Sequence, residues 1–366
     1  MIPNRIRTLD GIRGIAILMV VAGHCAQNYR PLGEEMRRWL LAFANPGAGV
    51  RLFFVLSGYL ITHLLLRERT ASGTISLLGF YGRRALRIFP AFYAYLLLVG
   101  LWQLRDPSGL TNEMWIAAST FTWNYALLWI DVPPQGYWNL GHLWTLALEQ
   151  QFYLLWPLLL LLCGIRRSLW LAVALIAWCP LARIGTYFCF PEQRGLVVMM
   201  FHTGVDSLMM GCAAALLVQA DAVRAALRSR GPLFAGVALM WMLVLSPLAG
   251  ELLRGFPIVL GLTLDALAAA GLIAWLHHSP PAWAESLLGR GLLPLIGVVS
   301  YSWYLWQQIF LSPTGPLGRG EIVLPVIASI IAAGLSYSLI ERPFLRFRFR
   351  LAPRTAPAAV TQRLPL

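Results

Sequence analysis

The chain has 366 residues, of which 58% are hydrophobic and only 12% are charged. A soluble domain has about a quarter of its residues charged, so this composition excludes that class and predicts an integral membrane protein. The net charge is +13, and every basic residue counted in it is an arginine. A lysine base or Schiff base is therefore excluded. In a membrane protein such a charge indicates loops beside anionic lipid, or a pocket for an anionic ligand, rather than nucleic acid binding.

Apolar segments of about 20 residues, the length that spans a bilayer, occur along most of the chain. The predicted spans are 11–29, 47–66, 86–104, 148–164, 168–188, 197–218, 232–249, 256–276, 292–312 and 322–341. A further segment, 113–130, contains Asn124 and is followed by Asp131, Pro133 and Pro134, so we predict that it is interfacial or re-entrant. The fold class is therefore an all-α bundle of about ten transmembrane helices.

Arginine is distributed unevenly between the two sets of loops. With ten spans and the N-terminus inside, the inner segments carry roughly twice as many arginines as the outer ones, as the positive-inside rule requires. Both termini are therefore predicted to be cytoplasmic. Residues 1–345 are predicted to form one membrane domain, and the basic, Pro/Ala-rich tail 346–366 is predicted to be disordered.

The first span carries ionisable residues, which are costly inside a membrane and indicate a functional site. Asp10 and Arg13 lie at its start and His24 lies deep within it. Arg13 and His24 are eleven residues apart, about three helical turns, so they share one face at an axial separation of about 16 Å.

The second and third spans carry further polar motifs. Ser57, Gly58 and Tyr59 allow either close helix packing or a polar cavity lined by the serine and tyrosine hydroxyls. Arginines 83, 84 and 87 begin the third span, where they predict either an ordinary cytoplasmic anchor or a clamp for phosphate. A nucleotide-bearing donor such as coenzyme A would fit such a clamp.

The fourth motif runs from His142 to Tyr153 and includes Trp144 and Glu149. Glu149 is either a solvated carboxylate at a helix end or a group that orients an imidazole or a substrate hydroxyl. A later aromatic run, 300–307, is predicted to pack in the core, and Glu341 with Arg342 is predicted to form an ion pair or a helix stop.

Together these motifs resemble acyltransferase family 3, whose members include bacterial membrane O-acetyltransferases of envelope glycans. The resemblance covers Leu9 to about Phe344. The family's Arg-x10-His pair matches Arg13 and His24, and its paired arginines match Arg84 and Arg87. Its remaining stretches match Ser57-Gly58-Tyr59, then Trp144-Thr145-Leu146 with Glu149, Phe152 and Tyr153, and finally Asp206, Leu208 and Gly211.

Two positions depart from the family's pattern. Many relatives carry a second acid where this chain has Gln150, and a histidine where it has Gln307. A mechanism that needs either group is in doubt here. Many relatives also carry an appended hydrolase-like domain, and we expect this chain to be the membrane module alone.

The resemblance implies a multi-pass enzyme of the bacterial inner membrane. It would transfer an acyl group, acetyl above all, from acyl-coenzyme A to a hydroxyl of a glycan or glycosylated acceptor. His24 would be the general base or acyl carrier, with Glu149 and Tyr153 as orienting groups and the arginines as phosphate ligands. No metal, permanent cofactor or nucleic acid is expected, and the oligomeric state is open. The alternatives are a proton-coupled transporter or flippase, and a structural subunit of an envelope complex.

Overall fold

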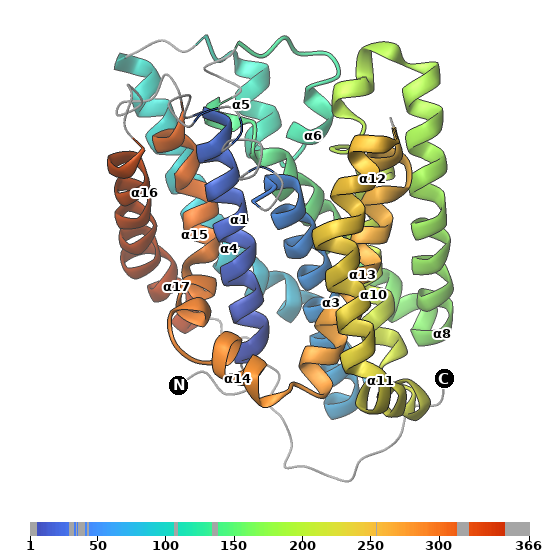
Figure 1. The fold of residues 1–366 in the computed structure, drawn as a ribbon. Helices are drawn as coiled ribbons and strands as arrows, with labels where there is room; N and C mark the ends of the chain where they lie inside the picture. The colour runs from blue at the N-terminus through green and yellow to red at the C-terminus, as the bar shows by residue number, and fades with distance from the viewer. Residues whose placement is uncertain are drawn as a thin grey trace.

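The computed structural model describes residues 6–28, 33, 35, 41, 44–105, 109–133, 138–253, 255–312 and 322–347. All regular elements within these residues are helices, which confirms the all-α class. Figure 1 shows a bundle in which the start of α1 and the last described helix, α17, lie at the same end. Residues 348–366 lie outside the described part, so the disorder of the tail stays a prediction.

The first three long helices follow the predicted spans. They are α1 (Arg7–Asn28), α3 (Pro46–Ser72) and α4 (Leu77–Arg105). The start of α3 is fixed by its cap, because the Asn45 side chain accepts a hydrogen bond from the Ala48 N–H at 3.2 Å and Pro46 has no N–H to satisfy. The helix ends at Gly73, whose φ of 78° is readily adopted by glycine.

Segment 113–130 forms no continuous span. It folds into two short helices, α5 (Asn112–Ser119) and α6 (Trp123–Ala126), as its polar content predicted. Helix α8 (Leu143–Cys189) then covers two predicted spans, 148–164 and 168–188. It is broken between them at Gly164, where φ is 72° and ψ is 178°.

The predicted span 197–218 is shorter than expected. It contains α9 (Phe201–Gly204) and the 12-residue α10 (Asp206–Leu217), preceded by the 3₁₀ turn η1 (Pro191–Leu196). Twelve residues rise about 18 Å, less than a hydrocarbon core of about 30 Å. Asp206 interrupts the segment, and its buried carboxylate accepts a hydrogen bond from Arg183 at 2.7 Å.

The remaining chain completes the bundle. Its elements are α11 (Asp221–Met240), η2 (Trp241–Leu245), α12 (Ser246–Leu252), η3 (Pro257–Gly261), α13 (Leu262–His278), α14 (Ala282–Gly289), α15 (Leu292–Leu311), α16 (Val323–Leu335), η4 (Ser336–Glu341) and α17 (Arg342–Phe347). Seven helices of the described part are long and apolar enough to cross a membrane, or eight if α14 and α15, bent by 47°, form one span. This is fewer than ten, because α8 counts once and α10 is short.

Glycines bring two pairs of helices into close contact. A Cβ at Gly58 of α3 would overlap the carbonyl oxygen of Leu208 of α10, and a Cβ at Gly211 would overlap that of Val55. Gly14 of α1 and Gly297 of α15 meet the partner helix's backbone in the same way. Such contacts are typical of membrane helix interfaces. The close-packing interpretation of Ser57-Gly58 is therefore confirmed, and α3 is held with Ser57 beside α8.

We predict that Gly58→Ala lowers the melting temperature of the detergent-solubilised protein, because overpacking a tight interface costs about 1–3 kcal/mol. Gly271→Ala in α13 is the matched control, since a Cβ there meets no atom within 4 Å. It should leave the melting temperature unchanged or raise it. Equal melting temperatures for the two variants would contradict the close contact of α3 and α10.

Candidate active site

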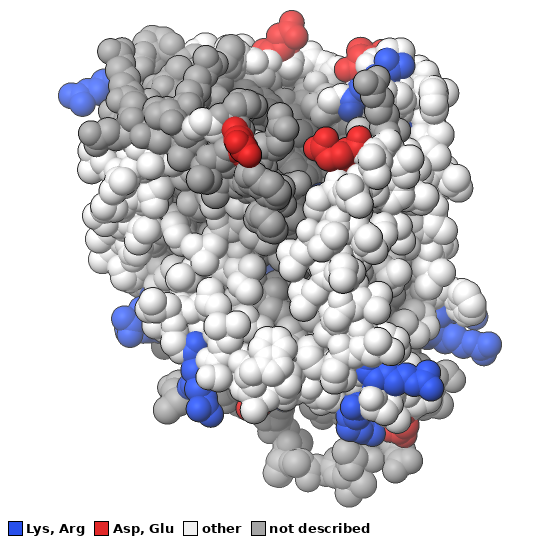
Figure 2. Space-filling view, in the orientation of Figure 1, with Lys and Arg blue, Asp and Glu red and all other residues white. Residues whose placement is uncertain are grey.

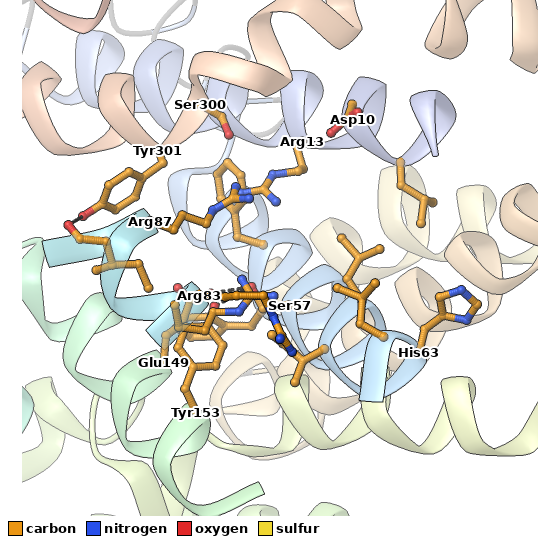
Figure 3. A pocket seen from close by; sticks show the side chains of 18 of the residues that line it. Asp10, Arg13, Ser57, His63, Arg83, Arg87, Glu149, Tyr153, Ser300 and Tyr301 are labelled. Carbon is orange, nitrogen blue, oxygen red and sulfur yellow. Dashed lines mark hydrogen bonds between the residues drawn. The ribbon is translucent and has the colours of Figure 1, made fainter. Parts of the chain in front are cut away.

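A cavity of about 520 Å³ lies between α1, α3, α4, α8 and α15. Eight of the predicted site residues line it, and they come from four different helices. They are Asp10, Arg13, Ser57, Arg83, Arg84, Arg87, Glu149 and Tyr153. Figure 3 shows most of them converging from opposite walls, with Arg13 and Arg87 pointing toward one another.

A hydrogen-bonded group of three forms one wall of the cavity. The Ser57 hydroxyl donates to Glu149 Oε1 at 2.6 Å, and the Tyr153 hydroxyl donates to Ser57 Oγ at 3.3 Å. Glu149 and Tyr153 are four residues apart on α8, so they share the helix face that meets α3. Glu149 is thus a buried carboxylate held inside the bundle rather than a solvated helix end.

Apart from the exposed Arg67 at its edge, three arginines of the cavity lack partners of their own. Within the described residues, Arg13, Arg84 and Arg87 form no hydrogen bond or ion pair, and the buried Arg13 Nε is unpaired. Arg84 lies 5.4 Å from the centre of the Tyr153 ring as a cation–π contact. Guanidinium groups bind phosphate and carboxylate through paired N–H donors, so this trio suits an anionic ligand.

Arg83 is different from these three. It donates to Glu68 Oε2 at 2.8 Å in an ion pair, and Glu68 Oε1 also accepts from the Ser76 N–H. Its charge is therefore already balanced at the edge of the cavity.

His24 does not line the cavity. Its Nδ1 lies 3.0 Å from Gln307 Oε1, and Gln307 Nε2 donates to Gln308 Oε1 at 3.0 Å. A carbonyl oxygen only accepts, so in this arrangement Nδ1 carries the proton and Nε2 keeps its lone pair. Glu149 is bonded to Ser57 and makes no hydrogen bond to His24. Gln307, a departure from the family pattern, is thus the residue that fixes this imidazole.

Two other predicted residues lie outside the cavity lining. Tyr59 is buried and shares a 2.6 Å hydrogen bond with His277 Nδ1, while its ring stacks on His63. Trp144 packs edge-on against Phe54, with ring centres 6.0 Å apart. The prediction that Tyr59 lines the cavity is wrong, because Ser57 and Tyr59 point to different sides of α3 and Ser57 alone faces the cavity. Beside Trp144, it is Thr145 that faces the cavity.

Part of the cavity lining comes from residues that were not predicted to lie there. Ser300, Tyr301 and Tyr304 of the aromatic run face the cavity, as does Glu341. The Glu341 carboxylate accepts a hydrogen bond from Ser302, so it is buried in the bundle rather than paired with Arg342. The available signal was spacing, because Ser300, Tyr304 and Gln307 fall on one face of an apolar helix. Within the described residues no His, Cys, Asp and Glu cluster suits a metal ion.

The helical bundle has the composition of a membrane protein, and its cavity is lined by several arginines. The acyltransferase domain model of acyltransferase family 3 matches residues 6–341. The chain therefore belongs to this family, as its motifs predicted.

Two relatives illustrate the similarity. The "Putative peptidoglycan O-acetyltransferase YrhL" of Bacillus subtilis (strain 168) is 29% identical over 93% of this chain and 55% of its own length. The peptidoglycan O-acetyltransferase OatA of Listeria monocytogenes is 27% identical over 93% of this chain and 56% of its own length. The chain thus spans about half the length of these relatives. No solved structure matches it.

Proposed function

We propose that the protein transfers an acyl group, with acetyl as the expected group, from acyl-coenzyme A to a glycan hydroxyl. The observation that carries this proposal is the set of unpaired guanidinium groups, Arg13, Arg84 and Arg87, around the cavity of an acyltransferase-family chain. Family membership favours acyl transfer over a transporter, a flippase or an assembly subunit. The names of the relatives make peptidoglycan the first acceptor to test.

The arginine distribution supports a cytoplasmic entrance for the donor. Blue arginine side chains gather at the lower end of the molecule in Figure 2, where α1 begins and α17 ends, and red acidic side chains gather toward the upper end. We take the lower end as cytoplasmic, in the inner membrane of a bacterium. Counting α8 as two crossings at Gly164, the bent pair as one and α10 as a short one gives the ten crossings of the proposed topology.

In this arrangement Arg84 and Arg87 would hold the donor's phosphates. Arg13 and Asp10 would lie beside its pantetheine arm, which would then run along α1. Because α1 is continuous, Arg13 and His24 are about 16 Å apart along its axis. The donor's phosphate end and the reacting thioester would therefore occupy different levels of the bundle.

His24 would act as the general base toward an acceptor that arrives from the opposite side of the membrane. Its Nε2 lone pair would accept the hydroxyl proton while Nδ1 remains bonded to Gln307. A transient acyl-histidine is the other possible role. Glu149 would act within the cavity through Ser57, where it balances the arginine charge, rather than by orienting His24.

We predict that His24→Ala abolishes acyl transfer, measured as thiol release from acetyl-coenzyme A with peptidoglycan glycan strands as acceptor. The variant should keep the melting temperature of the unmodified protein, because the half-buried ring contributes one hydrogen bond to the fold. Full activity in a folded His24→Ala protein would overturn the proposed function.

We predict that Arg84→Ala and Arg87→Ala each raise the KM for acetyl-coenzyme A by about tenfold to a hundredfold, because a hydrogen bond between charged groups is worth about 1.5–3 kcal/mol. Arg83→Ala is the control. It should raise the KM for acetyl-coenzyme A less, because the Arg83 guanidinium already forms an ion pair with Glu68. A larger effect from Arg83→Ala would assign the phosphates to the cavity edge instead.

We predict that Gln307→Leu lowers kcat about tenfold or more with little change in KM. The variant removes the acceptor that selects the Nδ1–H tautomer, and a catalytic imidazole in the wrong tautomer lowers kcat strongly. Gln307→Glu should keep activity, because its carboxylate also accepts from Nδ1. If Gln307→Leu is as active as the unmodified protein, the tautomer is set by another group.

A further inference from the structure

His142 is a buried imidazole to which neither the fold nor the proposed mechanism gives a role. It precedes the first residue of α8 and is 4% exposed. Neither of its ring nitrogens makes a hydrogen bond of normal geometry within the described residues, although the Leu305 backbone lies close to the ring. Leaving a buried polar group unpaired costs about 1–3 kcal/mol, and folded proteins satisfy about nine in ten such groups. A buried imidazole whose hydrogen-bonding capacity is not met by well-formed bonds therefore indicates a ligand that bonds to it.

The two tyrosine hydroxyls nearest His142 are already occupied. The Tyr95 ring contacts it edge-on at 5.4 Å, but the Tyr95 hydroxyl donates to the Asn139 carbonyl at 2.6 Å. The Tyr304 ring lies 5.6 Å away, and its hydroxyl is bonded to Thr145 Oγ1 at 2.7 Å. The His142 imidazole and the Trp306 indole N–H, which packs against the same Tyr95 ring, are thus the groups in this cluster with hydrogen-bonding capacity left over.

Two separate elements place His142 beside His24. Tyr304 of α15 contacts His142, and Gln307, three residues further along the same helix, bonds to His24. Residues three apart share a helix face and differ by about 4.5 Å in height. Trp138, four residues before His142, contacts the His24 ring edge-on at 6.4 Å. His142 therefore lies about one helical turn from His24 on the side of the cavity.

Only one layer of side chains separates His142 from the cavity. Thr145 and Tyr304 line the cavity, and both hydroxyls also bond to the His142 carbonyl oxygen, at 2.9 and 3.2 Å. A thioester that enters with its phosphates on Arg84 and Arg87 must pass this layer to reach His24. Directly behind Tyr304 in this layer lies the His142 ring.

We propose that His142 donates a hydrogen bond to the carbonyl oxygen of the acyl group during its transfer at His24. This inference rests on the proposed function. The acceptor oxygen attacks the carbonyl carbon while its proton moves to His24 Nε2. The charge that develops on the carbonyl oxygen is stabilised by the His142 N–H. The C–S bond then breaks, the sulfur leaves with the electron pair, and the proton on His24 Nε2 is returned to it. A neutral imidazole supplies the one donor that is required.

The test compares His142→Leu with His142→Gln. The leucine variant removes the donor and fills the site with apolar atoms, whereas glutamine keeps an N–H donor. We expect His142→Leu to lower kcat by about 10²–10³, the usual effect of losing one such donor, with the KM for acetyl-coenzyme A unchanged. Its melting temperature should be unchanged or higher, because an unpaired buried group has been removed. His142→Gln should recover at least a tenth of the lost activity.

Ser168→Ala is the matched control. Ser168 also carries a buried hydroxyl without a partner, but it lies beyond the Gly164 break and outside the cavity lining. The Ser168→Ala variant should keep full activity.

A fully active His142→Leu protein overturns the inference. A His142→Leu protein with a reduced kcat and a lower melting temperature also overturns it, if His142→Gln is no more active. If His24→Ala is inactive while His142→Leu is fully active, the inference alone fails. If His24→Ala is active, the proposed function fails first.

Discussion

The structure depends on how guanidinium groups are accommodated within an apolar helical bundle. An unpaired charge inside a membrane is costly, and the chain deals with its buried arginines in two ways. Arg51 donates to Asp265 at 3.0 Å, and Arg183 donates to Asp206 at 2.7 Å and to Thr263. These contacts join α3 to α13, and α8 to α10 and α13, and none of their residues lines the cavity. Their role is to hold the bundle together.

The cavity arginines are accommodated differently. Arg13, Arg84 and Arg87 share a cavity with Glu149 and Glu341, yet no ion pair joins them to either carboxylate in the described part of the chain. The carboxylates are bonded to serines instead, Glu149 to Ser57 and Glu341 to Ser302. The two carboxylates thus offset the positive charge of the arginines without bonding to them. The guanidinium N–H groups stay available to a ligand. Close glycine contacts between α3 and α10, and between α1 and α15, fix the helices on which these groups sit.

Much of the site could be predicted from the sequence, because polar residues inside apolar spans stand out. Arg13, Ser57, Arg84, Arg87 and Glu149 all line the cavity. The side of the helix on which each of these side chains lies was harder to predict. Ser57 and Tyr59 are two residues apart, about 200° around the helix, so the short motif that contains both cannot face one cavity.

Tertiary contacts decided what the sequence could not. Tyr301 and Tyr304 were not predicted to line the cavity, because aromatic residues in a span usually pack in the core. Glu341 was not predicted there either, because it was expected to pair with Arg342 or to end the helix. The short length of α10 could not be predicted, because the apolar composition of the segment is continuous. The break at Gly164 depends on a backbone conformation that composition does not reveal. The bond from Gln307 to His24 joins residues 283 positions apart and has no local pattern.

The central claim is that the internal cavity holds an acyl-coenzyme A donor with its phosphates on the arginines. An experimental density map of the protein with bound coenzyme A would test this most directly. The account predicts phosphate density beside Arg84 and Arg87 and a thiol end near Thr145 and Tyr304. Coenzyme A bound elsewhere, such as on the surface beside Trp283 and Arg290, with an empty cavity would contradict it.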